Sequence, residues 1–238
     1  MWSLEGRVAL ITGANGGIGR ELCQVLESCG AIVLRTDLVI PDQADRTSQH
    51  WFACDVTKES EVELLFEWVE SGWDHVDILV NNAGLLRTAP VAKTTAALWD
   101  AVFAVNAFGP FITTRQALPK MRAAGFGRIV TIASSAGLTG GSAETAAYGA
   151  SKAAAIAFTR AVAREAARDG VTANSIAPYV IETAMIADVP GMDERIAQIP
   201  VGRSGTPRDV AAAVAYLCSA EAGYVTGETL RLTGGFIP

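Results

Sequence analysis

Tyr148 and Lys152 are four residues apart in the stretch YGASK at positions 148–152. If this stretch is helical, the phenol and the ammonium lie on one face of the helix. A free tyrosine has a pKa of about 10, which is too high for a general base at neutral pH. A neighbouring ammonium stabilises the phenolate and lowers that pKa, so the pair predicts proton transfer at a substrate oxygen.

Two further polar residues could assist the same chemistry. Ser135 lies thirteen residues before Tyr148, just past an apolar run, where its hydroxyl could stabilise charge on a substrate oxygen. Asn106 lies inside a long apolar helical pattern, where an amide is locally unfavourable. It predicts a bend in that helix or a held water molecule that links to Lys152. Each feature alone also has a simpler explanation: a solvated helix face for the Tyr–Lys pair, and a satisfied core amide for Asn106.

A glycine-rich stretch near the N-terminus predicts a phosphate-binding turn. The stretch TGANGGIG at 12–19 lies between a predicted strand and a predicted helix. Glycine lets the backbone turn sharply and approach a pyrophosphate, whose charge then lies at the helix N-terminus. Such a turn also occurs for steric reasons alone, but its place in the first strand–helix connection favours a dinucleotide site. The residues expected at the dinucleotide are Gly13, Asn15, Gly17, Ile18 and Gly19.

Asp37 ends the second predicted strand, 18 residues after Gly19. A carboxylate at this position accepts hydrogen bonds from ribose hydroxyls and repels a 2′-phosphate. The alternative is an N-cap or a solvated loop aspartate. Arg20 and Arg35 could each meet a phosphate instead, but the acid favours NAD over NADP as the cofactor.

The next two strand ends extend the predicted cofactor site. Asp55 follows the third strand and could hydrogen-bond an adenine amino group, with Val56 packed nearby. Asn82, Ala83 and Gly84 follow the fourth strand, where small residues let the backbone approach the cofactor. Turn chemistry is the alternative for both stretches, because Asx residues and glycine are common at strand ends.

Short apolar runs alternate with longer helical patterns along the whole chain. The predicted strands cover 8–12, 31–35, 50–54, 78–80, 128–133, 171–176 and 229–232. The predicted helices cover 18–28, 58–71, 97–125, 147–168 and 207–218. Most runs are continuously apolar, as in parallel strands covered on both faces. The alternation predicts an α/β, Rossmann-type, doubly wound parallel sheet with helices on both faces, in a single domain over 1–238.

Composition argues against several other classes of protein. The 238 residues carry a formal net charge of −6 and no Lys/Arg cluster, so no nucleic-acid partner is expected. No apolar run is expected to cross a bilayer and no signal-peptide layout is seen, so no membrane partner is expected. The four cysteines lack metal-ligand spacing, which predicts no metal site and reduced thiols in a cytoplasmic protein.

In order and spacing, these motifs resemble the short-chain dehydrogenase/reductase family over essentially the whole chain. The matching pieces are TGANGGIG at 12–19, NNAG at 81–84, VN at 105–106, Ser135 and YGASK at 148–152. The resemblance implies a catalytic tetrad of Asn106, Ser135, Tyr148 and Lys152. It also implies ribose contacts from Tyr148 and Lys152, nicotinamide-side contacts from Pro178, Ile181 and Thr183, and a homotetramer, with a dimer as the alternative.

The chain departs from the family pattern at three places. Tyr179 follows Pro178 where relatives usually have glycine, and Thr233 stands where they usually have aspartate. The stretch expected to form the substrate lid, 184–200, is rather short. The Tyr179 ring could line the substrate pocket beside the nicotinamide or turn outward onto a neighbouring subunit.

The leading functional prediction is an oxidoreductase that moves a hydride between NAD(H) and a secondary alcohol or ketone, with Tyr148 as general acid and base. Apolar residues expected at the pocket mouth favour a small apolar or cyclic alcohol. Two alternatives remain: a 3-oxoacyl-carrier-protein reductase, an activity that usually goes with NADP and a basic docking surface, and a non-catalytic NAD-binding scaffold or sensor.

Overall fold

The computed structural model describes residues 2–42, 50–186 and 191–236. Its strands are β1 (Val8–Thr12), β2 (Ile32–Asp37), β3 (Trp51–Ala53), β4 (Ile78–Asn81), β5 (Gly127–Ile132), β6 (Val171–Pro178) and β7 (Thr229–Leu232). Its longer helices are α1 (Gly17–Ser28), α2 (Glu59–Trp73), α3 (Ala96–Phe103), α4 (Gly109–Ala124), α6 (Ala146–Ala166) and α8 (Pro207–Cys218). Its shorter helical segments are η1 (Val91–Lys93), η2 (Ala104–Phe108), α5 (Ala136–Thr139), η3 (Ala167–Asp169), η4 (Ala184–Ile186) and α7 (Met192–Ala197).

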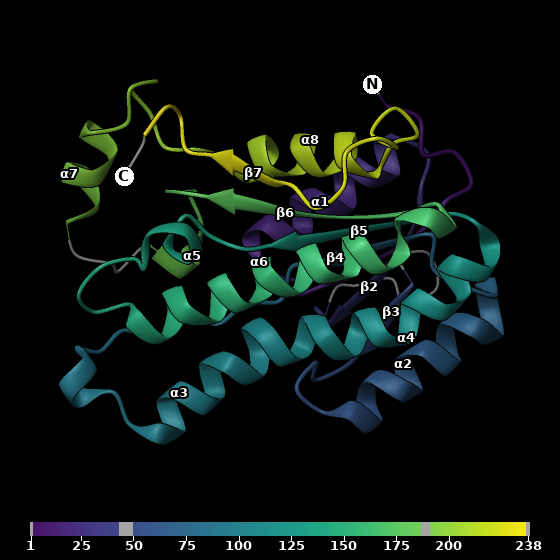
Figure 1. The fold of residues 1–238 in the computed structure, drawn as a ribbon, viewed down its shortest axis with the longest axis horizontal. Helices are drawn as coiled ribbons and strands as arrows, with labels where there is room; N and C mark the ends of the chain where they lie inside the picture. The colour runs from purple at the N-terminus through teal and green to yellow at the C-terminus, as the bar shows by residue number, and fades with distance from the viewer. Residues whose placement is uncertain (1, 43–49, 187–190, 237–238) are drawn as a thin grey trace.

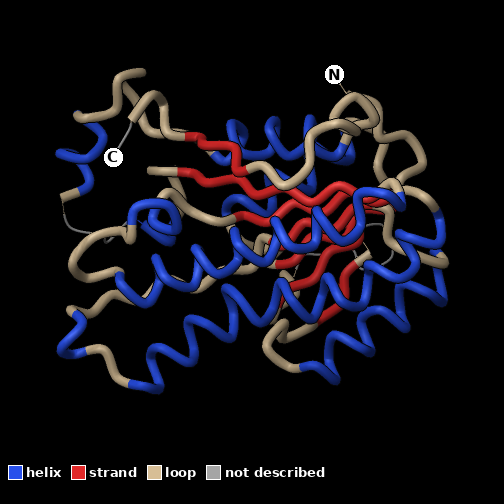
Figure 2. Tube along the Cα trace, in the orientation of Figure 1, coloured by secondary structure: helices blue, strands red, loops and turns tan. Residues whose placement is uncertain are grey.

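The strands form one parallel sheet in the order β3-β2-β1-β4-β5-β6-β7. Figure 2 shows the sheet between two layers of helices. Every residue of β1, β4, β5 and β6 is buried, which explains why these strands are mostly apolar, although β5 and β6 also bury polar side chains such as Arg128 and Asn174. The predicted doubly wound, Rossmann-type α/β fold is confirmed.

Alternate side chains of the strands point to two separate cores. Ala9 and Ile11 of β1 pack with α1 and α8 on one face of the sheet. Val8 and Leu10 of the same strand pack with α2, α4 and α6 on the other face. Figure 1 shows the two helix layers on opposite sides of the strands. This covering leaves the strand ends as the place where polar side chains can gather.

The predicted helix over 97–125 is helical almost throughout, but not all of it is α-helix. α3 and α4 are separated by η2, a single π-helical turn that contains Asn106. The extra residue in a π turn changes the direction of the side chains that follow, and such turns are frequent at functional sites. The helix therefore departs from regular α geometry at Asn106, and the expected bend stays a prediction.

The same region corrects an expectation about membranes. The helical run Ala96–Ala124 is long and apolar enough, by length and composition alone, to cross a bilayer. Core helices pass this test as well, and Ile112, Leu118 and Met121 of this run are buried against the sheet. No run of this kind was expected from the sequence.

All four cysteines are free and buried. Burial raises the pKa of the Cys23, Cys54 and Cys218 thiols to about 12. Within the described ranges, no group of three or more His, Cys, Asp or Glu side chains could hold a metal ion.

Candidate active site

The predicted site residues converge on one edge of the sheet. Gly13 directly follows β1, Asp37 ends β2, Asn82 directly follows β4, and Pro178 ends β6. These strands are parallel, so all four ends lie on the carboxyl side. The strand order reverses between β1 and β4, and ligands of open α/β sheets bind in the crevice at such a point.

The glycine turn is shaped by contacts that leave no room for side chains. Gly13 has a φ of +64°, and a Cβ on it would lie 2.8 Å from Cα of Ala83. A Cβ on Gly19 would lie 2.1 Å from the carbonyl oxygen of Gly13. Helix α1 begins after Gly16 with no side-chain cap and no acidic residue in its first turn. Its first amides therefore fit a pyrophosphate group.

The stretch Asn82-Ala83-Gly84 braces this turn. Nδ2 of Asn82 donates to the carbonyl oxygens of Thr12 and Gly13, at 2.9 and 3.0 Å. The backbone amides of Asn82 and Ala83 both donate to Oγ1 of Thr12, at 3.0 Å each. Asn82 thus holds the shape of the turn, and Thr12 is a residue that sequence reasoning missed.

Asp37 is fixed beside the glycine turn. Its carboxylate accepts hydrogen bonds from the backbone amides of Asn15 at 2.9 Å and Leu38 at 2.8 Å. The guanidinium of Arg35 is buried and pairs with Glu27, while Arg20 donates to Oδ1 of Asn15 at 2.7 Å. The two arginines that could have met a phosphate therefore have protein partners.

The predicted adenine contacts have their own local partners. Oδ1 of Asp55 accepts from the backbone amide and hydroxyl of Thr57, at 2.9 and 2.7 Å. Val56 is buried, and a Cβ on Gly109 of α4 would lie 3.1 Å from it. These are the turn contacts that the sequence left open, and the adenine role of Asp55 stays a prediction.

Lys152 lies in the interior at the first turns of α6. Its Nζ donates to the carbonyl oxygen of Ile132 at 2.8 Å. Burial lowers the pKa of Lys152 to about 8. A Cβ on Gly84 would lie 3.4 Å from Nζ of Lys152 and 3.6 Å from Oδ1 of Asn106, so this glycine keeps the space beside both groups open.

Tyr148 stands one turn earlier on the same helix, as predicted. Burial raises the pKa of its phenol, and a hydrogen bond with the Ser134 side chain opposes that rise. Nζ of Lys152 lies 5.9 Å from the centre of the Tyr148 ring. The lowered pKa is expected for a phenol beside both Lys152 and a bound nicotinamide, so it stays a prediction for the site with its cofactor.

Ser134, not Ser135, is the serine that meets Tyr148. The backbone amide of Ser135 donates to the carbonyl oxygen of Pro178 at 2.8 Å, and Ser135 precedes the short helix α5. The predicted contact of the Ser135 hydroxyl with a substrate oxygen stays a prediction, and Ser134 is added as a second candidate for that contact. Both serines are buried, so spacing in the sequence could not separate them.

Asn106 holds the site together through direct bonds. Its Oδ1 accepts from the Leu85 amide and its Nδ2 donates to the Leu85 carbonyl, at 2.9 Å each. Nδ2 also donates to Oγ of Ser151 at 3.0 Å. These bonds use both donors of the amide and join residue 85 to α6, while the expected water link from Asn106 to Lys152 stays a prediction.

The residues after β6 reach back to the glycine turn. A Cβ on Gly17 would lie 3.0 Å from Cγ2 of Thr183, which places Thr183 over the start of α1. Ile181 is buried and forms an isolated bridge with Gly205. Ile18 packs on the core beneath. In the predicted lid, 184–186 and 192–197 form η4 and α7, and 187–190 lie outside the described residues.

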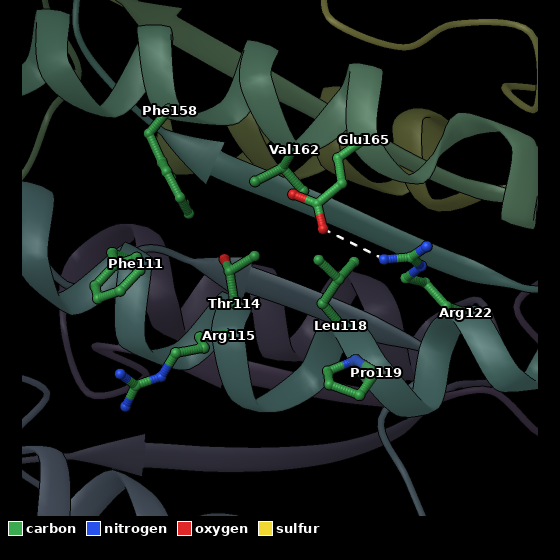
Figure 3. A pocket seen from close by; sticks show the side chains of 9 residues that line it. All are labelled: Phe111, Thr114, Arg115, Leu118, Pro119, Arg122, Phe158, Val162 and Glu165. Atoms are coloured by element: carbon green, nitrogen blue, oxygen red, sulfur yellow. Dashed lines mark hydrogen bonds and ion pairs between the residues drawn. The ribbon is translucent and has the colours of Figure 1, made fainter.

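A groove of about 480 Å³ lies elsewhere, between α4 and α6. Figure 3 shows its lining side chains facing one another across the two helices. They are Phe111, Thr114, Arg115, Leu118, Pro119, Arg122, Phe158, Val162 and Glu165. None of the predicted site residues belongs to this groove.

Comparison with known proteins agrees with this geometry. A family model described as enoyl-(acyl carrier protein) reductase matches residues 13–237. Nodulation protein G of Rhizobium sp. (strain N33) is 39% identical over 244 residues, which cover 99% of this chain and 98% of the relative. A 3-oxoacyl-(acyl-carrier-protein) reductase of Vibrio cholerae is 39% identical over 242 residues, or 98% of each chain.

Solved structures give the same result. The crystal structure of a candidate gluconate dehydrogenase from Agrobacterium tumefaciens matches with a TM-score of 0.91 and 32% identity. The match covers 98% of this chain and 96% of that one. Together with the glycine turn, the NNAG stretch and the Tyr148–Lys152 pair on α6, these matches show that the chain belongs to the short-chain dehydrogenase/reductase family.

Proposed function

We propose that this oxidoreductase transfers a hydride between NAD(H) and a secondary alcohol or ketone. The observation that carries the proposal is the meeting of Tyr148, Lys152 and Ser134 beside the glycine turn and Asp37. The uncapped amides of α1 fit a pyrophosphate, and the bare face of Gly84 leaves space next to Lys152. The residues present therefore fit a nicotinamide dinucleotide.

Each polar group has a distinct part in the reaction. The cofactor, when bound, supplies or accepts the hydride that no side chain can carry. Tyr148 takes the proton from the alcohol oxygen or returns it to the ketone oxygen. The Ser134 hydroxyl, rather than that of Ser135, hydrogen-bonds the same oxygen and stabilises its charge. Lys152 holds a positive charge near the phenol and the ribose, which lowers the pKa of Tyr148 in the loaded site.

The preference for NAD rests on charge. A 2′-phosphate beside the Asp37 carboxylate would be repelled, and the Arg35 guanidinium that could attract it is paired with Glu27. Asp55 and Val56 complete this end of the site as the adenine neighbours.

A second candidate is a 3-oxoacyl-carrier-protein reductase. The name of the Vibrio cholerae relative favours it, and the same tetrad would serve a keto group on an acyl chain. Asp37 and the net charge of −6 instead favour NAD and a secondary alcohol or ketone. A non-catalytic NAD-binding scaffold is the least favoured function. Burial of the Lys152 ammonium costs folding free energy, and binding of a cofactor alone does not require it.

The deciding experiment compares NAD and NADP in the oxidation of a panel of secondary alcohols and in the reduction of a 3-oxoacyl thioester. Wild type is expected to favour NAD and an alcohol, and Asp37→Ala to lose most of the preference for NAD. Tyr148→Phe should lose activity on the order of 10²–10⁴-fold while still binding NAD. Faster turnover with NADP and the thioester would establish the second candidate instead.

We also propose that the α4–α6 groove is covered by a second copy of the chain, in a homotetramer or a homodimer. Phe108 and Phe111 of η2 and α4 are exposed beside it, and Phe158 of α6 faces them across the groove. A cytoplasmic location is proposed from the four free, buried thiols. Sizing of the protein with and without Phe111→Glu tests the assembly.

A further inference from the structure

The ring of Tyr179 lies flat on the ring of Phe236. Their centroids are 4.3 Å apart and their planes differ by 5°. Tyr179 directly follows β6, and its backbone amide donates to the carbonyl oxygen of Leu232, the last residue of β7. The sequence left open whether this ring lines the pocket or meets another subunit. The structure pairs it with the C-terminal segment (residues 233–236) of the same chain.

The C-terminal segment is also fastened to the turn that follows α7. The amide of Val201 donates to the carbonyl oxygen of Gly234 at 3.0 Å. A Cβ on Gly234 would lie 2.6 Å from Cγ2 of the buried Ile199, and one on Gly235 would lie 3.2 Å from Pro200. Figure 1 shows the end of β7, α7 and the end of β6 together at one end of the sheet.

On its other side, Tyr179 adjoins the residues of the proposed site. The carbonyl oxygen of Pro178 accepts from the amide of Ser135 at 2.8 Å, next to Ser134. The carbonyl oxygen of Val180 accepts from the amide of Gly205 at 2.9 Å. Thr183 then contacts Gly17 of the glycine turn. Residues 178–183 therefore contact three parts of the chain. These are the loop that carries Ser134 and Ser135, the glycine turn and, through the Tyr179 ring, the C-terminal segment.

We propose that Tyr179 and Phe236 are a positioning pair for the active site. Their stack ties residues 199–201 and 233–236 to residues 178–183, and so holds Pro178, Ile181 and Thr183 at the nicotinamide; this inference rests on the proposed function. Among the described residues, no hydrogen bond or ring contact joins this stack to Tyr148, Lys152 or Ser134. Its loss therefore weakens binding of cofactor and alcohol more than it slows the chemical step.

The test uses Phe236→Ala, Tyr179→Ala, the double variant and Phe236→Tyr, which keeps a stacking ring. Trp2→Ala is the matched control, because it removes another aromatic contact, with Tyr216 of α8 at 5.2 Å between centroids. Binding of NAD is measured by titration calorimetry without turnover. Values of kcat and KM are measured with the best alcohol, and the melting temperature checks folding.

Aromatic pairs of this kind predict a rise of about two- to tenfold in the Kd for NAD and the KM for alcohol in each single alanine variant. In the double variant, Kd and KM are expected to rise no further than in either single variant. We expect kcat to stay within about twofold of wild type in all three. Phe236→Tyr and Trp2→Ala are expected to behave as wild type. Unchanged Kd and KM in Phe236→Ala, or equal changes in Trp2→Ala, would overturn the inference while wild type still binds NAD. Wild type that binds neither dinucleotide overturns the proposed function and the inference with it.

Discussion

The side-chain amide of Asn106 donates a 3.0 Å hydrogen bond to Oγ of Ser151, and that hydroxyl donates to the backbone carbonyl of Tyr148 at 2.7 Å. Asn106 and Ser151 are fully buried. The π turn at 104–108 is thus joined to the first turns of α6, which carry Tyr148 and Lys152. Through its bond to the carbonyl of Tyr148, the buried Ser151 fixes the turn of α6 that carries Tyr148 and Lys152.

Ser151→Ala is expected to lower kcat/KM by about tenfold and the free energy of unfolding by roughly 1–3 kcal/mol, because one buried donor of Asn106 loses its acceptor. Thr159→Val is the matched control on the same helix. It removes a buried hydroxyl that bonds Thr131 at 3.0 Å and Ala155 at 2.8 Å. It should cost stability but not activity. Equal losses of kcat/KM in both variants would contradict a positioning role for Ser151.

Alanine variants of the neighbouring residues Ser134 and Ser135 distinguish the roles of the two hydroxyls. Ser134→Ala removes the hydroxyl that meets Tyr148, and loss of one such donor typically costs on the order of 10²–10³ in kcat. Ser135→Ala keeps the backbone amide that bonds Pro178 and should retain activity within a few-fold. Steady-state kinetics with saturating NAD measure both. A larger loss of kcat in Ser135→Ala than in Ser134→Ala would assign to Ser135 the role that the sequence predicted.

The sequence predicts the fold well because its signals are local. The continuously apolar strands and the glycine turn each follow from a few adjacent residues, and β1, β7 and α8 begin and end where predicted. Ser134 and Ser135 are neighbours and both are buried, so a spacing count cannot tell which hydroxyl meets Tyr148. The stack of Tyr179 on Phe236 joins residues far apart in the sequence, through a C-terminal segment with no helix or strand pattern.

The pKa of Tyr148 shows the same limit in energetic terms. A pattern of two residues four apart, with a nicotinamide expected nearby, predicts an attraction between these cations and the phenolate, which lowers the pKa when the cofactor is bound. It contains nothing about burial, which raises the pKa of Tyr148 and lowers that of Lys152. The balance is decided by the surrounding fold, so it could be worked out only from the structure.

Burial of the Lys152 ammonium should lower the free energy of unfolding, although the proposed reaction needs this charge. Burial lowers the pKa of Lys152 from 10.5 to about 8, so below pH 8 the folded protein holds a charge that the unfolded chain holds more easily. Lys152→Met keeps a similar chain length without the charge. At pH 7 this variant is expected to be inactive yet more stable than wild type by roughly 1–3 kcal/mol, after allowance for the lost bond to Ile132.

The sign of the pH dependence gives the check. Between about pH 8 and pH 10.5 the folded state has lost the Lys152 proton while the unfolded chain still holds it, so wild-type stability rises relative to the variant. The advantage of Lys152→Met should therefore be complete below pH 8 and gone near pH 10.5. Urea unfolding of both proteins across this range measures the difference, in which the contributions of the buried cysteines cancel. Lys93→Met, at an exposed site, should show no such trend. A variant less stable than wild type at pH 7, with a difference that does not change with pH, would mean that the Lys152 charge is stabilised where it lies.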